Sequence, residues 1–258
     1  MSGKMPAIFV SHGAPSLIVE DCPTRDFLRG LGKEIGRPKG IVSVSAHWTT
    51  AEPRVTINPH PDTIYDFGGF ADELYTLVYP APGDPLLAGK VLSLMGQKGI
   101  TGGKDSSRGY DHGAWAPLML MYPEADIPVI QLSVQPHLGP DHHLAIGKAL
   151  APLREEGILI LASGAATHNL RDFFGRALDE APLPYAREFT EWLKDAVIND
   201  RRDELLDYQR QAPQAIRNHP TPEHFLPIFA AMGAGEKGDL LHDGYTYGAL
   251  SMAAFEWE

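Results

Sequence analysis

Short apolar segments rich in β-branched residues recur along the chain, between segments whose apolar residues repeat every three to four positions. Segments of the first kind predict buried strands, because each run is brief and is bounded by glycine, proline or serine. Strands are expected at residues 6–12, 39–48, 127–134 and 157–164. Their nearly continuous hydrophobicity is typical of strands that are covered on both faces, as in α/β proteins.

The segments of helical periodicity have apolar side chains on one face. Helices are expected at residues 23–36, 84–99, 140–157 and 185–200. Strands that alternate with helices imply a mainly parallel or mixed central sheet flanked by helices. Residues 49–83 are rich in aromatic residues, glycine and proline, and ordered excursions of this kind often form pocket walls. We therefore expect one α/β domain that spans residues 1–258.

Composition narrows the class of protein. The chain of 258 residues carries 33 acidic and 22 basic residues, and this net charge of −11 argues against a general nucleic-acid-binding protein. Cys22 is the only cysteine, so an internal disulfide is excluded and a reducing, cytoplasmic location is expected. No apolar stretch approaches the length of a membrane span, and the first ten residues predict a strand rather than a signal peptide.

Three of the eleven histidines stand at or just beyond the carboxyl ends of predicted strands: His12, His47 and His168. Ligands of open α/β sheets bind beyond this end of the strands, so the three imidazoles are expected to share one edge of the sheet. A single histidine at a strand end is usually an ordinary loop residue, but three at equivalent positions are harder to ascribe to chance. Because neutral imidazole is a common ligand for zinc, iron and copper, the sequence predicts a metal site at the C-terminal ends of the strands.

Two further histidines stand out by their context. His112 lies between Asp111 and a Gly-Ala-Trp turn, just before a helical segment. His224 stands beside Glu223, in a segment where Pro227 is expected to interrupt any helix. In a helix these two side chains would lie on different faces, so only one of them is expected to reach a given site. The other histidines are interpreted as loop residues or exposed helix residues: His60, His137, His142, His143, His219 and His242.

Other chemistries receive less support from the sequence. A single cysteine excludes a zinc site of the C-x-x-C type, and neither of the glycine-rich nucleotide-binding motifs is present. The segments SHGAPS and SGAATH contain Ser11 and Ser163, but neither segment matches the G-x-S-x-G elbow of a serine hydrolase. Both serines are therefore interpreted as turn residues.

Several motifs together resemble a known family. They are, in order along the chain, SHGAP, VSVSAHW, DFGGF, YPAPG, DHGAW, LASGAATHNL and TPEHFLP. With them the chain resembles, over about residues 6–251, the DOPA 4,5-dioxygenase group of the class III extradiol ring-cleaving dioxygenases, the superfamily of the protocatechuate 4,5-dioxygenase catalytic subunit. The resemblance implies a non-haem enzyme that uses O2 to open the ring of a DOPA-like catechol beside its two hydroxyls, which gives a product of the muconic-semialdehyde type.

The resemblance also implies roles for individual histidines. His12 and His47 match the two metal-binding histidines of the family. His168 matches the catalytic base, and His112 matches a second active-site histidine that contacts substrate or oxygen.

The third metal ligand is where this sequence departs from the wider superfamily, which has a glutamate at that position. His224 of the segment TPEHFLP is expected to be this ligand, with Glu223 as the alternative. Fe(II) is the metal that the resemblance implies for activity. A site of three histidines would also suit Zn(II), with His168 as a fourth ligand when zinc is bound.

Aromatic side chains in and beside residues 49–83 are expected to enclose the ring of the substrate, although each could equally belong to the core. The candidates are Trp48, Tyr65, Phe67, Phe70, Tyr75 and Tyr79. No arginine is assigned to a substrate carboxylate, because Arg108 and Arg171 are near motif residues only in the sequence.

Two other functions are consistent with the same scaffold. One is a zinc-dependent hydrolase, although no H-E-x-x-H motif supports it. The other is a non-catalytic member of the superfamily that binds a metal or a ligand in the same pocket. The presence of both His112 and His168 argues against this second alternative, because a binding protein needs neither an acid nor a base. The identity of the catechol and the number of subunits do not follow from the sequence.

Overall fold

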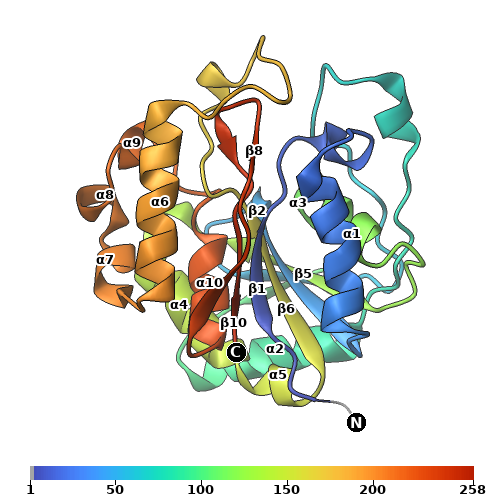
Figure 1. Ribbon diagram of the computed structural model, residues 1–258. Coiled ribbons are helices and arrows are strands. Elements are labelled where there is room, and N and C mark those ends of the chain that lie inside the picture. Colours follow the sequence, from blue (N-terminus) through green and yellow to red (C-terminus); the bar gives the residue numbers. More distant parts are fainter. Residues whose placement is uncertain (1–2) are drawn as a thin grey trace.

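An eight-stranded mixed sheet forms the centre of the computed structural model, which describes residues 3–258 (Figure 1). Its strands are β1 (Ala7–Ser11), β2 (Gly40–Thr49), β3 (Arg54–Thr56), β4 (Gly103–Asp105), β5 (Val129–Val134), β6 (Ile158–Gly164), β7 (Gly238–His242) and β10 (Ala254–Trp257). Their order in the sheet is β4-β3-β5-β2-β6-β1-β10-β7, and the central β5, β2, β6 and β1 are mutually parallel. The carboxyl ends of these four strands therefore meet at one edge.

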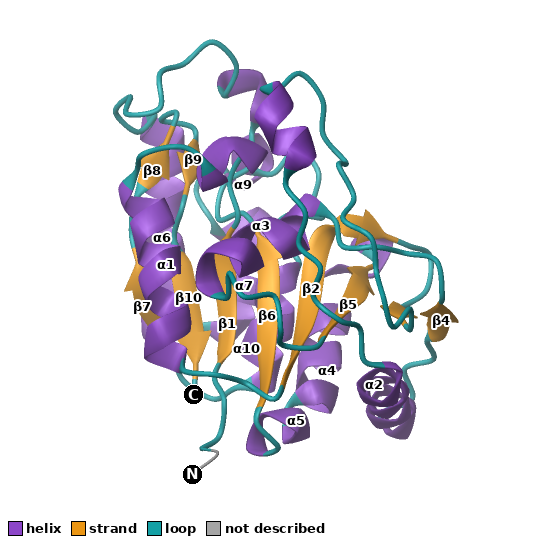
Figure 2. Cartoon of the chain, turned by 90° about the vertical axis from the view of Figure 1, so that its right-hand side faces the viewer, coloured by secondary structure: helices purple, strands orange, loops and turns teal. Residues whose placement is uncertain are grey.

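Helices cover both faces of the sheet, which gives the molecule three layers (Figure 1). One face is covered by α1 (Pro23–Ile35) and α3 (His112–Met121). Figure 2 shows the sheet from the side of α1 and α3. The other face is covered by α2 (Pro85–Gln97), α4 (Gly139–Leu150), α6 (Pro184–Ile198) and α10 (Pro227–Ala234). The shorter elements are α5 (Pro152–Glu155), α7 (Arg202–Leu206), α8 (Tyr208–Gln211), α9 (Ala215–Asn218), the 3-10 helices η1 (Pro15–Ile18), η2 (Asp72–Thr76), η3 (Pro136–Leu138) and η4 (Leu170–Asp172), and the β8 (Tyr245–Thr246) and β9 (Leu250–Ser251) pair.

Alternate residues of the parallel strands point to opposite faces, and both faces are apolar. In β1, Ile8 and Val10 pack in the layer of α1 and α3, whereas Ala7 and Phe9 pack in the layer of α4 and α10. Every residue of β5 and β6 is buried. This burial on both sides explains why the sequence reads as continuous apolar runs rather than as an alternation.

The predicted α/β class is confirmed, and the predicted strands and helices are present. The helix expected at residues 140–157 is divided into α4 and α5, because Pro152 cannot continue the hydrogen bonds of the first helix and begins the second. Strands β3, β4 and β7 to β10 were not predicted, because each is short and none has the long apolar run that marks the central strands. Within residues 3–258, no helix is long and apolar enough to cross a membrane.

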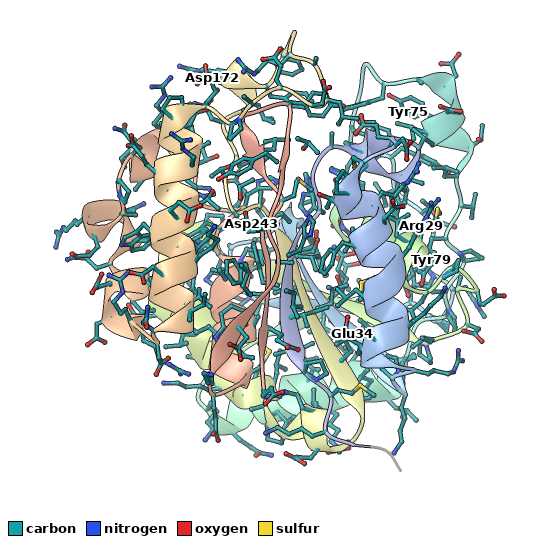
Figure 3. The ribbon with its side chains drawn as sticks, viewed as in Figure 1. Arg29, Glu34, Tyr75, Tyr79, Asp172 and Asp243 are labelled. Carbon is teal, nitrogen blue, oxygen red and sulfur yellow. The ribbon has the colours of Figure 1, made fainter. Side chains whose placement is uncertain are left out.

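Two long loops rise beyond the carboxyl ends of the parallel strands. One contains η2 and the labelled Tyr75, and the other contains η4 and the labelled Asp172 (Figure 3). The second loop is tied to the segment around β8 and β9, since Tyr247 N donates to Leu178 O and Leu183 N donates to Gly248 O. The two chain ends lie at the opposite edge of the sheet (Figure 1).

Candidate active site

Three histidines, which we call the histidine triad, converge at the carboxyl edge of the sheet. His12 follows β1, His47 lies in β2, and His224 lies in the turn before α10. Nε2 of His47 lies 3.0 Å from Nε2 of His12 and 3.1 Å from Nε2 of His224. The three rings therefore direct the same nitrogen toward a common point.

A buried serine holds the ring of His12 from behind. Nδ1 of His12 lies 2.9 Å from Ser163 Oγ, and this hydroxyl donates to the carbonyl of Gly113. Because the single hydroxyl proton is used toward Gly113, the imidazole Nδ1 is the donor and Nε2 keeps its lone pair. Ser163 lies in β6, and Ser11, which ends β1, donates to Ala253 O. The interpretation of both serines as turn residues was therefore wrong.

Carboxylates hold the other two rings of the histidine triad. Nδ1 of His47 lies 3.3 Å from Asp66 Oδ2. Nδ1 of His224 donates to Glu223 Oε1 at 3.1 Å. An ionised carboxylate can only accept, so Nδ1 of His224 carries the proton and its Nε2 keeps a lone pair. The negative charge of Asp66 beside Nδ1 of His47 favours the same arrangement in that ring.

The electrostatics of the histidine triad fit a divalent metal ion. Burial, followed by the neighbouring histidines, lowers the pKa of His12 and of His224 well below the usual value, and burial lowers the pKa of His47 to about 3. Three unprotonated nitrogens that face one another repel unless a cation lies among them. Two imidazole nitrogens bound at about 2.1 Å to one ion, at about a right angle, would lie about 3.0 Å apart. The observed separations match this arrangement.

Two other groups of potential ligands share a histidine with the triad. They are His47, Asp66 and His112, and His168, Glu223 and His224. In each group the carboxylate already accepts a hydrogen bond from an imidazole Nδ1. Asp66 Oδ1 accepts from His112 at 2.9 Å, and Glu223 Oε1 accepts from His224 at 3.1 Å. A carboxylate placed in this way orients a ligand or an active-site imidazole. The histidine triad is therefore the set whose unprotonated nitrogens face one another.

His168 and His112 lie beside the histidine triad. The ring of His168 stacks on that of His224, with centroids 3.4 Å apart and planes 9° apart. Burial, and then the neighbouring His47 and His112, lowers the pKa of His168 to about 3, so this imidazole is neutral at pH 7. His112 begins α3, and its ring centroid lies 3.9 Å from that of His47. The structure thus brings together all five histidines that the sequence singled out.

A cavity of about 420 Å³ opens over these five histidines. Phe67 and Phe70 of the η2 loop line its wall. Leu170, Phe173 and Phe174 of the η4 loop line it as well. The cavity is therefore mainly apolar, with imidazoles at its floor, as in sites that bind small molecules.

Several of the aromatic residues expected in the wall have other places. Tyr65 and Tyr75 pack against Phe67, with ring centroids 6.3 and 5.1 Å away, so they support the wall from behind. Trp48 and Tyr79 belong to the interior, with 6% and 1% of their surface exposed, and do not line the cavity. Of the six aromatic candidates, Phe67 and Phe70 line the cavity.

Two glycines allow the segments of the site to approach each other. A Cβ atom at Gly164 would lie 2.2 Å from His224 O, and Ala165 N donates to the same carbonyl at 2.8 Å. The bare backbone at the end of β6 thus holds the turn that carries His224. A Cβ atom at Gly113 would lie 3.0 Å from His47 Cδ2, so glycine lets the first turn of α3 pack against this ring.

Glu223 and His224 both line the cavity, so the prediction that only one would reach it was wrong. Residues 220–226 form bends and turns, and α10 begins at Pro227. Pro227 is thus the first residue of a helix rather than an interruption, a position where its missing N–H costs nothing. Outside a helix, neighbouring side chains can point to the same side.

Asp66 was not among the site residues predicted from the sequence. Its Oδ1 accepts from the backbone N of His112 at 3.0 Å and from Nδ1 of the same residue, while Oδ2 faces His47. Burial raises the pKa of Asp66, but the hydrogen bond and charge of His112 outweigh this effect and lower the pKa to about 2. The signal was present in the segment DFGGF, where an acidic residue opens a glycine-rich aromatic stretch.

Two histidines interpreted as loop or exposed residues are buried. His143 Nδ1 donates to Gly139 O at 2.7 Å, and its Nε2 accepts from Gln135 N at 3.1 Å. His219 Nε2 donates to Ala166 O at 2.9 Å. Both residues satisfy backbone groups of the interior and do not line the cavity.

Residues 6–255 match the family described as the catalytic LigB subunit of aromatic ring-opening dioxygenase. The chain therefore belongs to this family and is an oxidoreductase, an extradiol ring-cleaving dioxygenase that depends on a non-haem metal. Within the family it belongs to the DOPA 4,5-dioxygenase group, which confirms the resemblance seen in the motifs.

Individual relatives cover nearly the whole chain. The chain is 44% identical to a 4,5-DOPA dioxygenase extradiol of Beta vulgaris, over 96% of this chain and 95% of that protein. It is 39% identical to a 4,5-DOPA dioxygenase extradiol of Escherichia coli (strain K12), over 99% of this chain and 95% of that protein. The crystal structure of an uncharacterized protein from Escherichia coli K12 is similar with a TM-score of 0.82 and 35% identity, and covers 98% of this chain and 100% of that chain.

Proposed function

We propose that residues 1–258 form one catalytic domain that uses O2 and Fe(II) to open the ring of a DOPA-like catechol, to a product of the muconic-semialdehyde type. In this proposal the histidine triad holds the metal. The observation that carries it is the convergence of three unprotonated Nε2 atoms below an apolar cavity, with neighbouring separations of 3.0 and 3.1 Å. The names of the relatives support the DOPA-like substrate.

The proposed ion is Fe(II), which the resemblance to extradiol dioxygenases implies, and neutral imidazole nitrogens are suitable ligands for it. Fe(II), when bound, would supply open positions that hold the two catechol hydroxyls and O2 next to each other. Zn(II) would be accepted by the same three nitrogens, with His168 as a fourth ligand, in a form without ring-opening activity.

The remaining side chains of the site would orient the ligands and move protons. Asp66 and Glu223 place negative charge directly behind His47 and His224, which offsets the absence of a carboxylate among the ligands. His168 lines the cavity outside the triad and would accept the proton that a catechol hydroxyl releases. His112, fixed through Nδ1 by Asp66, would present Nε2 to the substrate or to oxygen.

The proposal also includes the location and the partners of the protein, which rest on its composition and charge. The single Cys22 and the net charge of −11 support a cytoplasmic enzyme whose partners are small molecules, a catechol and O2, rather than nucleic acids or membranes.

Anaerobic loading with Fe(II), followed by exposure to O2 in the presence of DOPA, protocatechuate or catechol, tests the proposed function. We expect O2 uptake equal to the catechol consumed, together with the absorbance of a semialdehyde. The same protein loaded with Zn(II) is the control and should take up no O2. Ester hydrolysis by the zinc form, without O2 uptake by the iron form, would overturn the proposal.

Substitution of Asp66 by asparagine should lower turnover about 10- to 100-fold, because the neutral amide accepts a weaker hydrogen bond from His112 and places no negative charge beside His47. Iron affinity should fall as well, since His47 loses a charged partner. The matched control is Asp72→Asn, which removes an exposed carboxylate from η2 of the same loop. Equal kcat and equal iron affinity in the two variants would show that Asp66 has no positioning role.

A further inference from the structure

The cavity is lined by two carboxylates and by five imidazoles that belong to the proposed metal site and its surroundings. Among the lining residues that the structure describes there is neither a lysine nor an arginine, while Asp66 and Glu223 both line it. The volume of about 420 Å³ lies within the usual range of small-molecule pockets, about 300–1,000 Å³, so a catechol with a substituent can be accommodated. The net charge of −11 adds a long-range field of the same sign.

The arginines that are near the cavity in the sequence have partners elsewhere. Each forms an ion pair with a carboxylate outside the cavity lining: Arg108 with Asp111, Arg176 with Glu180, and Arg217 with Asp172. Arg171 is exposed on η4 and does not line the cavity. A carboxylate that entered the cavity would therefore lose water without gaining a cationic side chain, which is unfavourable.

Glu223 offers a partner of the opposite kind. Its Oε1 accepts from Nδ1 of His224 and from Thr221 Oγ1, at 3.1 and 2.9 Å. Oε2 takes part in none of the hydrogen bonds among the described residues, and 21% of the side chain is exposed where it lines the cavity. Ser251 also lines the cavity, and its buried Oγ has no hydrogen-bond partner among the described residues. This hydroxyl is neutral and can form a hydrogen bond with an ammonium group or with a carboxylate.

We propose that the cavity selects catechols whose side chain carries an ammonium group or no charge over those that carry only a carboxylate, and that Glu223 binds the ammonium group. This inference rests on the proposed dioxygenase function and specifies the substrate class of the same site. Glu223 forms a charge-assisted hydrogen bond with an ammonium group, whereas it repels a carboxylate. A side chain with both charges places its ammonium group toward Glu223 and its carboxylate toward solvent.

Binding of three catechols that carry different terminal groups on the same two-carbon linker tests the inference. Dopamine carries an ammonium group, 4-propylcatechol no charge, and 3-(3,4-dihydroxyphenyl)propanoate a carboxylate. Their dissociation constants are measured with the Fe(II)-loaded protein in the absence of O2, so that affinity is read without turnover. We expect the dissociation constant to rise in this order, by about threefold or more at each step.

Three variants locate the effect. Glu223→Gln keeps the Oε1 acceptor for His224 but removes the charge, and should reduce the ratio of the carboxylate to the ammonium dissociation constant by about threefold or more. Phe174 is 73% exposed at the cavity, and Phe174→Lys should lower the dissociation constant of the carboxylate compound by a similar factor. Asp239→Asn is the control, because it makes the same change in net charge as Glu223→Gln but lies far from the cavity. Asp239 lies in β7, opposite Glu256 of β10, at the end of the sheet away from the site, and its substitution should leave the ratio unchanged.

Two results would overturn the inference. One is tightest binding of the carboxylate compound by the parent protein, and the other is a ratio that Glu223→Gln leaves unchanged. The proposed dioxygenase function fails separately, if the Fe(II)-loaded protein takes up no O2 with any catechol, because the order of affinities is measured without O2.

Discussion

Replacement of His224 by alanine is expected to abolish stoichiometric binding of Fe(II), whereas replacement of Glu223 by glutamine should retain it. His224 supplies one of the three converging Nε2 atoms, and its loss leaves two nitrogens 3.0 Å apart that cannot hold the ion. Glu223 acts through His224 by accepting from its Nδ1, and a glutamine keeps an acceptor at this position. We expect the affinity of Glu223→Gln for iron to fall by no more than about tenfold.

Metal content after anaerobic loading and desalting measures this difference. His60→Ala removes an exposed histidine from a loop outside the cavity lining and serves as the matched control. A thermal unfolding curve for each variant separates loss of the ion from loss of the fold. The opposite pattern, with iron retained by His224→Ala and lost by Glu223→Gln, would make the carboxylate the third ligand.

Much of the fold could be predicted because the central strands are buried on both faces. Continuous apolar runs such as those of β5 and β6 predict inner strands from the local sequence alone, without information about the neighbouring strands. The positions of His12 and His47 followed from this, since parallel strands end at a common edge. The C-terminal β7 and β10 escaped prediction because their place in the sheet depends on antiparallel pairing with β1 and with each other.

The parts of the site that were missed or wrongly predicted lie in turns and loops, where the directions of the side chains do not repeat regularly along the sequence. Glu223 and His224 were expected on different faces of a helix, but turns at residues 220–226 allow both side chains to reach the cavity. Asp66 comes from a loop, and its contact with His112 spans 46 residues of sequence. His219 resembled a surface residue until the packing of Phe189 and Phe225 around it was known. Such contacts are set by tertiary structure, which local pattern does not encode.

His168→Ala should retain iron and lose about 10²- to 10⁴-fold of its turnover, the range that a general base contributes. The residue lines the cavity beside His224 but lies outside the histidine triad, so its removal leaves all three converging Nε2 atoms in place. The loss should appear in kcat, because proton removal is part of the reaction rather than of catechol recognition by the apolar walls.

Rescue by added imidazole distinguishes a proton acceptor from a packing residue at this position. Truncation of His168 opens space beside the His224 ring, which a small free base can enter from the cavity. We expect the turnover of His168→Ala to rise with the concentration of added imidazole, whereas that of Asp66→Asn should not, because the latter loses an orienting contact rather than a base. Complete loss of iron from His168→Ala would instead make His168 chiefly a metal ligand, and unchanged turnover would remove it from the reaction.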